Sequence, residues 1–321
     1  MGTKHSLRSS LIMPKGIQTL PILTAAFTIL ACQLFSAPTS PGPPTEMRFR
    51  LPTETPAQTP SETPTANAGS SLSARQNADQ PDEQSGYQVH VMYVLPSNGV
   101  DRELDTNGTL ANSVGSFQNW LTQQTGEAQL RFDTFEGRLD ISFYRLARSD
   151  ATIASFREYV RDQVQNDLQA AGFNQPNKLY AVYYDGTSTW ACGGGAWPPA
   201  LIGNAAMLYL QGLPDSSFPC NANVFADSPT APPGYLEFAM LHEIFHTLGA
   251  VAECAPHHIL SGHVSDGNTD LMYAGSESWY PAELDIGRDD YWGHNATCVD
   301  LSDSIFMEPM PTTAVMPPGW K

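Results

Sequence analysis

The sequence predicts one α+β domain that follows a long N-terminal extension. Within residues 87–321, apolar residues recur with the two-residue period of strands in some segments and with the helical period of about 3.6 residues in others. From residue 36 to about residue 86, Pro, Thr, Ser, Ala and Glu dominate instead, and such a segment cannot bury enough apolar surface to fold. We therefore expect a folded domain over residues 87–321 behind a disordered linker.

Short apolar segments predict the strands of a sheet. Val89–Leu95 and Leu179–Tyr184 are nearly continuous apolar runs, as in strands that are buried on both faces. Leu130–Phe132 and Leu139–Phe143 alternate between apolar and polar residues, which indicates strands with one covered face. Ala206–Leu210 is shorter, and we interpret it as an edge strand.

Three segments show helical periodicity. The first runs from about Leu110 to Gln124, and the second is a long helix from Ile153 to Ala171, with Ser149 or Asp150 as its cap and Gly172 as its end. The third begins near Leu236 and ends at Gly249. Its apolar stripe predicts a largely buried helix.

The N-terminus has the features of an export signal. Lys4, Arg8 and Lys15 precede an apolar run over residues 20–31, and no acidic residue occurs before Cys32. We therefore predict a signal peptide over residues 1–31.

Ile29-Leu30-Ala31-Cys32 resembles the cleavage box of bacterial lipoproteins, although Leu30 is bulkier than the usual residue. The resemblance implies a lipidated Cys32 and a linker over residues 32–86 that tethers the domain to the cell envelope; plain secretion is the alternative.

The charge balance limits the partners of the chain. The formal net charge is -17 at pH 7, and removal of the signal would make it more negative. Such a surface repels phosphate backbones and anionic lipid, so we expect no nucleic-acid partner and a membrane contact only through the lipid anchor. We expect a monomer.

Four cysteines remain besides Cys32, and in an exported chain an even set favours disulfides. Three pairings are possible. We expect Cys192 with Cys220 and Cys254 with Cys298. A cysteine zinc site is the alternative, but no Cys-x-x-Cys pair is present.

The third predicted helix contains His242-Glu243-Ile244-Phe245-His246. Histidines at i and i+4 lie one turn apart on one helix face, so both imidazoles can bind one metal ion, and Glu243 is placed to act as a general base. Such a site is typical of a catalytic zinc. The simpler interpretation is a core helix whose histidines only form hydrogen bonds to their neighbours.

His242, Glu243, His246 and Gly249 resemble the pattern of the metzincin zinc peptidases, and Asp270-Leu271-Met272-Tyr273 resembles their methionine turn. The whole run from His242 to Tyr273 resembles secreted bacterial zincin-like proteins. The resemblance implies a zincin-like α+β fold with a mixed, twisted sheet and long helices, in which Ala206–Leu210 is the edge strand that lines the cleft. It also implies a bound Zn²⁺ and the hydrolysis of peptide bonds in proteins or peptides. Glu243 would be the general base for a metal-activated water.

Ala252 stands where the family has its third histidine, so the third ligand must come from another position. We favour His257, because imidazole suits zinc and Pro256 stiffens the preceding backbone. His263 is the close alternative, and His258 and Asp266 remain open.

Three further features allow two interpretations each. The missing histidine at residue 252 leaves open a catalytically inactive cell-surface binding or adhesion protein as the alternative to a peptidase. Hydrolysis of a non-peptide amide would use the same metal-site residues and also remains open. The Gly-rich segment Cys192–Pro199 forms either a wall of the cleft or a surface loop. The aspartates between residues 266 and 290 form either a calcium site or, as we favour, a solvated acidic face.

Overall fold

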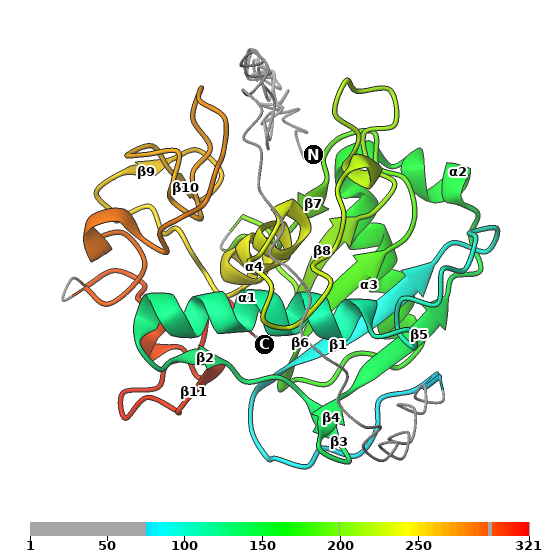
Figure 1. The fold of residues 1–321 in the computed structure, drawn as a ribbon, viewed down its shortest axis with the longest axis horizontal. Helices are drawn as coiled ribbons and strands as arrows, with labels where there is room; N and C mark the ends of the chain where they lie inside the picture. The colour runs from blue at the N-terminus through cyan, green and yellow to red at the C-terminus, as the bar shows by residue number, and fades with distance from the viewer. Residues whose placement is uncertain (1–74, 199, 295–296, 321) are drawn as a thin grey trace, which may run out of the picture.

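The computed structural model describes residues 75–198, 200–294 and 297–320. It has three layers, with a five-stranded sheet between two layers of helices (Figure 1). The strands of this sheet are β1 (Gln88–Leu95), β5 (Ile141–Arg145), β6 (Lys178–Tyr184), β7 (Gly193–Gly194) and β8 (Ala205–Tyr209). The fold is therefore α+β, as the sequence predicted, with a mainly parallel sheet.

The strand order across the sheet is β5-β1-β6-β8-β7. β1 pairs in parallel with β5 and β6, and β6 pairs in parallel with β8. β7 is antiparallel to β8 and lies outside it, with Gly194 opposite Met207. The predicted edge strand, Ala206–Leu210, is thus an inner strand at β8, and the Gly-rich segment supplies the edge.

Helices cover both faces of the sheet because both faces of β1 and β6 are apolar. Val91, Tyr93 and Leu95 belong to the core shared with α1 (Thr109–Thr125) and α4 (Tyr235–Thr247). Met92 and Val94 alternate with them and belong to the core shared with α2 (Asp150–Ala154) and α3 (Val160–Ala170). This alternation follows from the period of a strand.

The predicted long helix over residues 153–171 is interrupted. α2 is capped by Ser149, as expected, but it ends at Ala154, and the 3-10 turn η1 (Arg157–Tyr159) separates it from α3. Arg157 has a φ of 54°, which a continuous right-handed helix excludes. Phe156, the residue before this break, is 36% exposed.

Residues 75–86 contact the domain, although they fall within the stretch predicted to be linker. Arg75 forms ion pairs with Asp101 and Asp105. The buried ammonium group of Lys178 lies 2.6 Å from carboxylate oxygens of both Asp79 and Asp82. These ion pairs hold a segment that has little apolar surface of its own. The predicted signal peptide and Cys32 lie outside the described residues.

The chain after α4 consists of short elements and turns. They are β9 (His258–Ile259), β10 (His263–Val264), the 3-10 turns η3 (Ile286–Arg288) and η4 (Leu301–Asp303), and β11 (Met307–Glu308). β11 pairs with β2 (Gln129–Leu130), β3 (Thr134–Phe135) pairs with β4 (Arg138–Leu139), and η2 (Cys220–Ala222) precedes α4. None of the described helices has the length and apolarity needed to cross a membrane.

Both expected disulfides are present, which is compatible with an exported protein. Cys192 is bonded to Cys220, and Cys254 is bonded to Cys298. The second disulfide encloses β9, β10 and the predicted methionine turn. It therefore closes the part of the chain that has the least regular structure.

Replacing Cys254 and Cys298 together with Ser should lower the free energy of unfolding by about 4 kcal/mol. The reason is that the cross-link removes conformational entropy from an unfolded loop of 44 positions. Urea unfolding followed by fluorescence measures the loss. The matched double variant of Cys192 and Cys220, with a separation of 28 positions, should lose slightly less, about 3.5 kcal/mol. Equal stabilities of the parent and both variants would contradict this account.

Candidate metal centre

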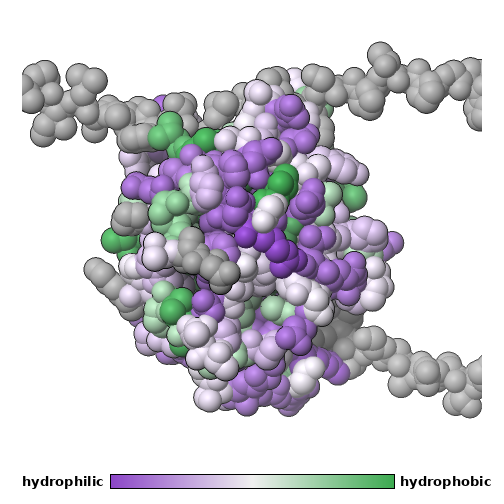
Figure 2. All heavy atoms as spheres, turned by 90° about the vertical axis from the view of Figure 1, so that its left-hand side faces the viewer, coloured by the Kyte–Doolittle hydropathy of each residue, from purple (hydrophilic) through white to green (hydrophobic). Residues whose placement is uncertain are grey.

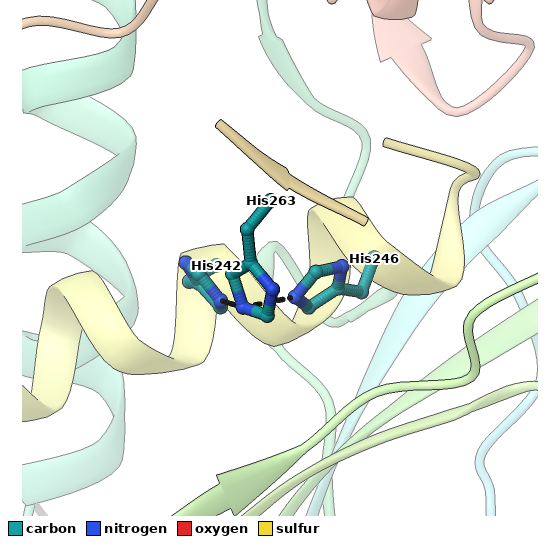
Figure 3. A group of neighbouring side chains, drawn as sticks. All are labelled: His242, His246 and His263. Atoms are coloured by element: carbon teal, nitrogen blue, oxygen red, sulfur yellow. Dashed lines mark hydrogen bonds between the residues drawn. The ribbon is translucent and has the colours of Figure 1, made fainter. Parts of the chain in front are cut away.

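Three histidine side chains from two elements point toward one another (Figure 3). His242 and His246 lie on α4, and His263 lies on β10. The Nε2 atom of His263 is 3.3 Å from Nε2 of His242 and 3.2 Å from Nε2 of His246. The three rings are at least 92% buried, with exposed fractions of 8%, 5% and 5%. The three nitrogens thus surround one point inside the protein.

The opposite nitrogen of each ring is held by a backbone carbonyl. Nδ1 of His242 lies 2.8 Å from the carbonyl oxygen of Leu271, and Nδ1 of His246 lies 2.9 Å from that of Ala250. Nδ1 of His263 is 3.3 Å from the carbonyl oxygen of Leu260. A carbonyl accepts only, so each Nδ1 must donate its hydrogen. This tautomer leaves an unprotonated Nε2, with its lone pair directed at the shared point.

Three lone pairs that face one another repel each other unless a cation lies between them. Zinc–imidazole bonds of about 2.0–2.1 Å in a tetrahedral arrangement place the nitrogens about 3.3–3.4 Å apart, close to the separations of His263 from the other two histidines. Burial also lowers the pKa of His242 to about 4 and that of His263 to about 3, which keeps both imidazoles neutral. The three residues fit a divalent metal ion that prefers nitrogen.

A tight hairpin brings His263 to α4. β9 and β10 pair antiparallel, and Ser261 and Gly262 in the turn both have positive φ. A Cβ atom on Gly262 would lie 2.1 Å from Nε1 of Trp197, so only glycine fits there. The amide of Val251, just after α4, donates to the carbonyl of Gly262 at 2.9 Å. These contacts fix the hairpin against the end of the helix.

His257, the favoured third ligand, lies outside the histidine group. Its Nδ1 atom is 2.9 Å from a carboxylate oxygen of Asp290, and its side chain is 40% exposed. His258 and Asp266 also lie outside the group. The structure thus brings the alternative, His263, together with His242 and His246, and does not bring His257 there. The stiff backbone at Pro256 did not indicate this, because the position of His263 depends on the Ser261-Gly262 turn.

Glu243 lies against the Gly-rich edge strand. A Cβ atom on Gly193 would be 2.4 Å from Oε1 of Glu243, and one on Gly195 would be 2.7 Å from Cβ of His246. Thr247 links the two segments, since its hydroxyl donates to the Glu243 carbonyl and accepts from the Ala196 amide. Residues 193–196 therefore form a wall of the site, which settles the two interpretations of this segment.

Glu243 itself is 8% exposed, and burial raises its pKa to about 8. The positive charge of Arg161 and the backbone amide of Gly195 act in the opposite direction but are weaker. A carboxylate with a raised pKa is a better proton acceptor than an exposed one. The site therefore combines three metal-binding imidazoles with an adjacent base.

The predicted methionine turn supports His242 through its backbone. Met272 is fully buried, and the preceding residue, Leu271, supplies the carbonyl that holds Nδ1 of His242. The carboxylate of Asp270 accepts from the Met272 amide at 2.7 Å and from the Tyr291 hydroxyl at 2.8 Å. Tyr291 thus stabilises the turn. The turn was predicted by resemblance; its support by Asp270 and Tyr291 was not predicted.

Comparison with known proteins gives only weak structural likeness. No protein-family model matches the sequence, and no curated protein matches it either. A solved structure, metalloproteinase-II from Bacteroides fragilis, is similar at 19% sequence identity and a TM-score of 0.26. The match covers 68% of this chain and 56% of that protein, so this chain spans little more than half of its length.

Replacing His263 with Ala should reduce the affinity for zinc at least tenfold, whereas replacing His257 with Ala should leave it nearly unchanged. Of these two residues, His263 has the nitrogen that faces those of His242 and His246. Zinc content after equilibrium dialysis at defined free zinc concentrations measures both effects. Loss of zinc from the His257 variant, but not from the His263 variant, would restore the original assignment.

In the metal-free protein, the contribution of His242 to stability should fall as the pH drops from about 6.5 toward 4. Burial lowers the pKa of His242 to about 4, so below its ordinary value near 6.5 the unfolded chain binds the proton and the folded chain does not. Urea unfolding of the parent and of a His242→Ala variant at several pH values measures this contribution as the difference between their free energies of unfolding. The parent should lose stability relative to the variant as the pH falls, and a difference that does not change with pH would refute this origin.

Proposed function

We propose that this chain is an exported, zinc-dependent endopeptidase. The observation that carries the proposal is the convergence of three buried, unprotonated imidazole nitrogens beside a buried carboxylate. His242, His246 and His263 would hold the ion, which leaves a fourth position open, as in catalytic rather than structural zinc sites. When bound, zinc supplies Lewis-acid polarisation of a carbonyl group and lowers the pKa of a water molecule.

The chain's own residues would handle the proton and the substrate. Glu243 would accept a proton from the attacking water and then donate it to the leaving amine, a role that suits a buried carboxylate with a raised pKa. The edge strand β7 lies beside Glu243. An extended peptide could add to that edge through backbone hydrogen bonds. This arrangement favours a peptide substrate over a small amide.

The rival function, an inactive binding protein on a related fold, depended on the missing histidine at residue 252. His263 supplies a third imidazole from another segment, so that absence no longer favours the rival. The two disulfides agree with a location outside the cytoplasm, where thiols oxidise. Attachment through a lipid on Cys32 is part of the proposal that the sequence alone supports.

Replacing Glu243 with Gln should lower the rate of peptide hydrolysis by a factor of about 10² to 10⁴, while the zinc content stays at that of the parent. The amide keeps the shape of the side chain but cannot accept the proton. Cleavage of a denatured general protein substrate, together with metal analysis, tests this. The exposed Glu253→Gln is the matched control and should retain the parental rate.

Two outcomes would count against the proposed function. A Glu243→Gln variant that cleaves at the parental rate would exclude Glu243 as the base. A purified parent that binds no zinc and cleaves nothing would favour the binding protein instead.

A further inference from the structure

A second group of potential ligands lies outside the histidine site and consists mainly of carboxylates. Oxygens of Asp285, Asp289 and Asp290 lie within 4.8 Å of one another, and so do ligand atoms of His257, Asp266 and Asp290. The two groups share Asp290 and are therefore contiguous. They join the end of the β9–β10 hairpin to the turn η3.

The sequence suggested a solvated acidic face, but three of these four carboxylates are buried, and only Asp289, at 47% side-chain exposure, is substantially exposed. Asp290 is fully buried, Asp285 is 5% exposed, and the side chain of Asp266 is 9% exposed. Both carboxylate oxygens of Asp266, Oδ1 of Asp285 and Oδ1 of Asp289 are inaccessible to solvent and accept no hydrogen bond. Buried anionic oxygens without a donor are strongly unfavourable unless a cation compensates them.

The nearest protein cation does not reach the unpaired oxygens of Asp266 and Asp289 within hydrogen-bond distance. Among the described residues, the ion pairs of these four aspartates involve only His257, whose imidazole contacts Asp290 at 2.9 Å and lies about 4 Å from Asp266 and Asp289. Arg288 is adjacent in sequence, but its guanidinium donates to the carbonyl of Gln124. Burial raises the pKa of Asp285 to about 6 and also raises that of Asp266, as expected for carboxylates that lack a counterion.

We propose that Asp266, Asp285, Asp289 and Asp290 bind one calcium ion. The ligand set is all oxygen, which hard cations prefer. At calcium–oxygen distances of about 2.3–2.6 Å, oxygens on opposite sides of the ion are about 4.6–5.2 Å apart. Within each of the two groups, which share Asp290, the ligand atoms lie within 4.8 Å of one another. Magnesium, at about 2.1 Å, requires a tighter set. Water would complete the calcium coordination.

The backbone presents one of these ligands in a fixed direction. Oδ2 of Asp285 accepts from the amides of Tyr291 and Trp292 at 2.9 and 2.6 Å, and this leaves Oδ1 for the ion.

The hairpin and turn η3 form part of the side of the molecule seen in Figure 2, whose surface is mostly hydrophilic with small apolar areas. A hydrated cation can approach such a surface without crossing an apolar barrier.

The calcium ion would stabilise the segment that presents His263. Asp266 follows His263 by three positions, and the η3 turn is already tied to the methionine turn because the Ile286 amide donates to Asp270. Calcium would therefore connect two segments that have little regular structure. This inference does not depend on peptide hydrolysis.

Addition of calcium chloride to the intact, metal-free chain tests the proposal. Isothermal titration should show one calcium ion per chain, and the Tm should rise by about 5–10 °C at a free calcium concentration about 100 times Kd. Asp285→Asn should weaken calcium binding at least tenfold, because its amide oxygen can still accept from residues 291 and 292 while its NH₂ group faces the ion. The exposed Asp215→Asn is the matched control and should bind calcium as the parent does.

Two further variants keep the test decisive. His263→Ala should lose zinc but keep its calcium response, which separates this site from the histidine site. If Asp285→Asn does not fold, Asp289→Asn, at a side chain that is 47% exposed, should show the same loss of calcium binding. A parent that gives no calcium heat and no Tm shift, or an Asp285 or Asp289 variant with parental affinity, would overturn the proposal. Binding of zinc instead of calcium at these aspartates would overturn it as well.

Discussion

The structure of the site depends on the direction in which three imidazole rings are held. Each ring donates from Nδ1 to a main-chain carbonyl, and this leaves Nε2 as an acceptor that faces the other two rings. Carbonyls of Leu271, Ala250 and Leu260 impose this orientation, and none of them lies in a regular element. The irregular chain after α4 is therefore what gives the helix histidines their chemistry.

Several separate contacts keep that irregular chain in place. The Cys254–Cys298 disulfide encloses it, the Val251 amide holds the hairpin turn, and the Asp270 carboxylate organises the methionine turn. These single cross-links and hydrogen bonds stabilise the segment in place of the repeated hydrogen bonds of a helix or sheet. The proposed calcium ion would add one more cross-link close to His263 in the sequence, where oxygens of Asp266, Asp285 and Asp289 otherwise lack hydrogen-bond partners.

The sequence predicted the elements that repeat and missed those that depend on single contacts. The strands at residues 88–95 and 178–184 and the helix carrying His242 follow from apolar periodicity, which extends over many residues. The break at Arg157 depends on one backbone angle, and no periodic signal reports it. The choice between His257 and His263 depends on the direction of a two-residue turn, and residue preference for zinc could not decide it. The acidic cluster was visible in the sequence, but its burial results from tertiary packing.

The edge strand β7 and the residue after it, Gly195, have a consequence for which substrates the proposed enzyme would accept. A side chain at Gly193 would collide with Glu243, and one at Gly195 would collide with His246, so this wall must remain bare main chain. A wall that consists of main chain alone can form hydrogen bonds with the backbone of a peptide, which is the same in all peptides. Discrimination among amino acids would then fall to other parts of the rim, where substitutions can accumulate without disturbing the reactive groups.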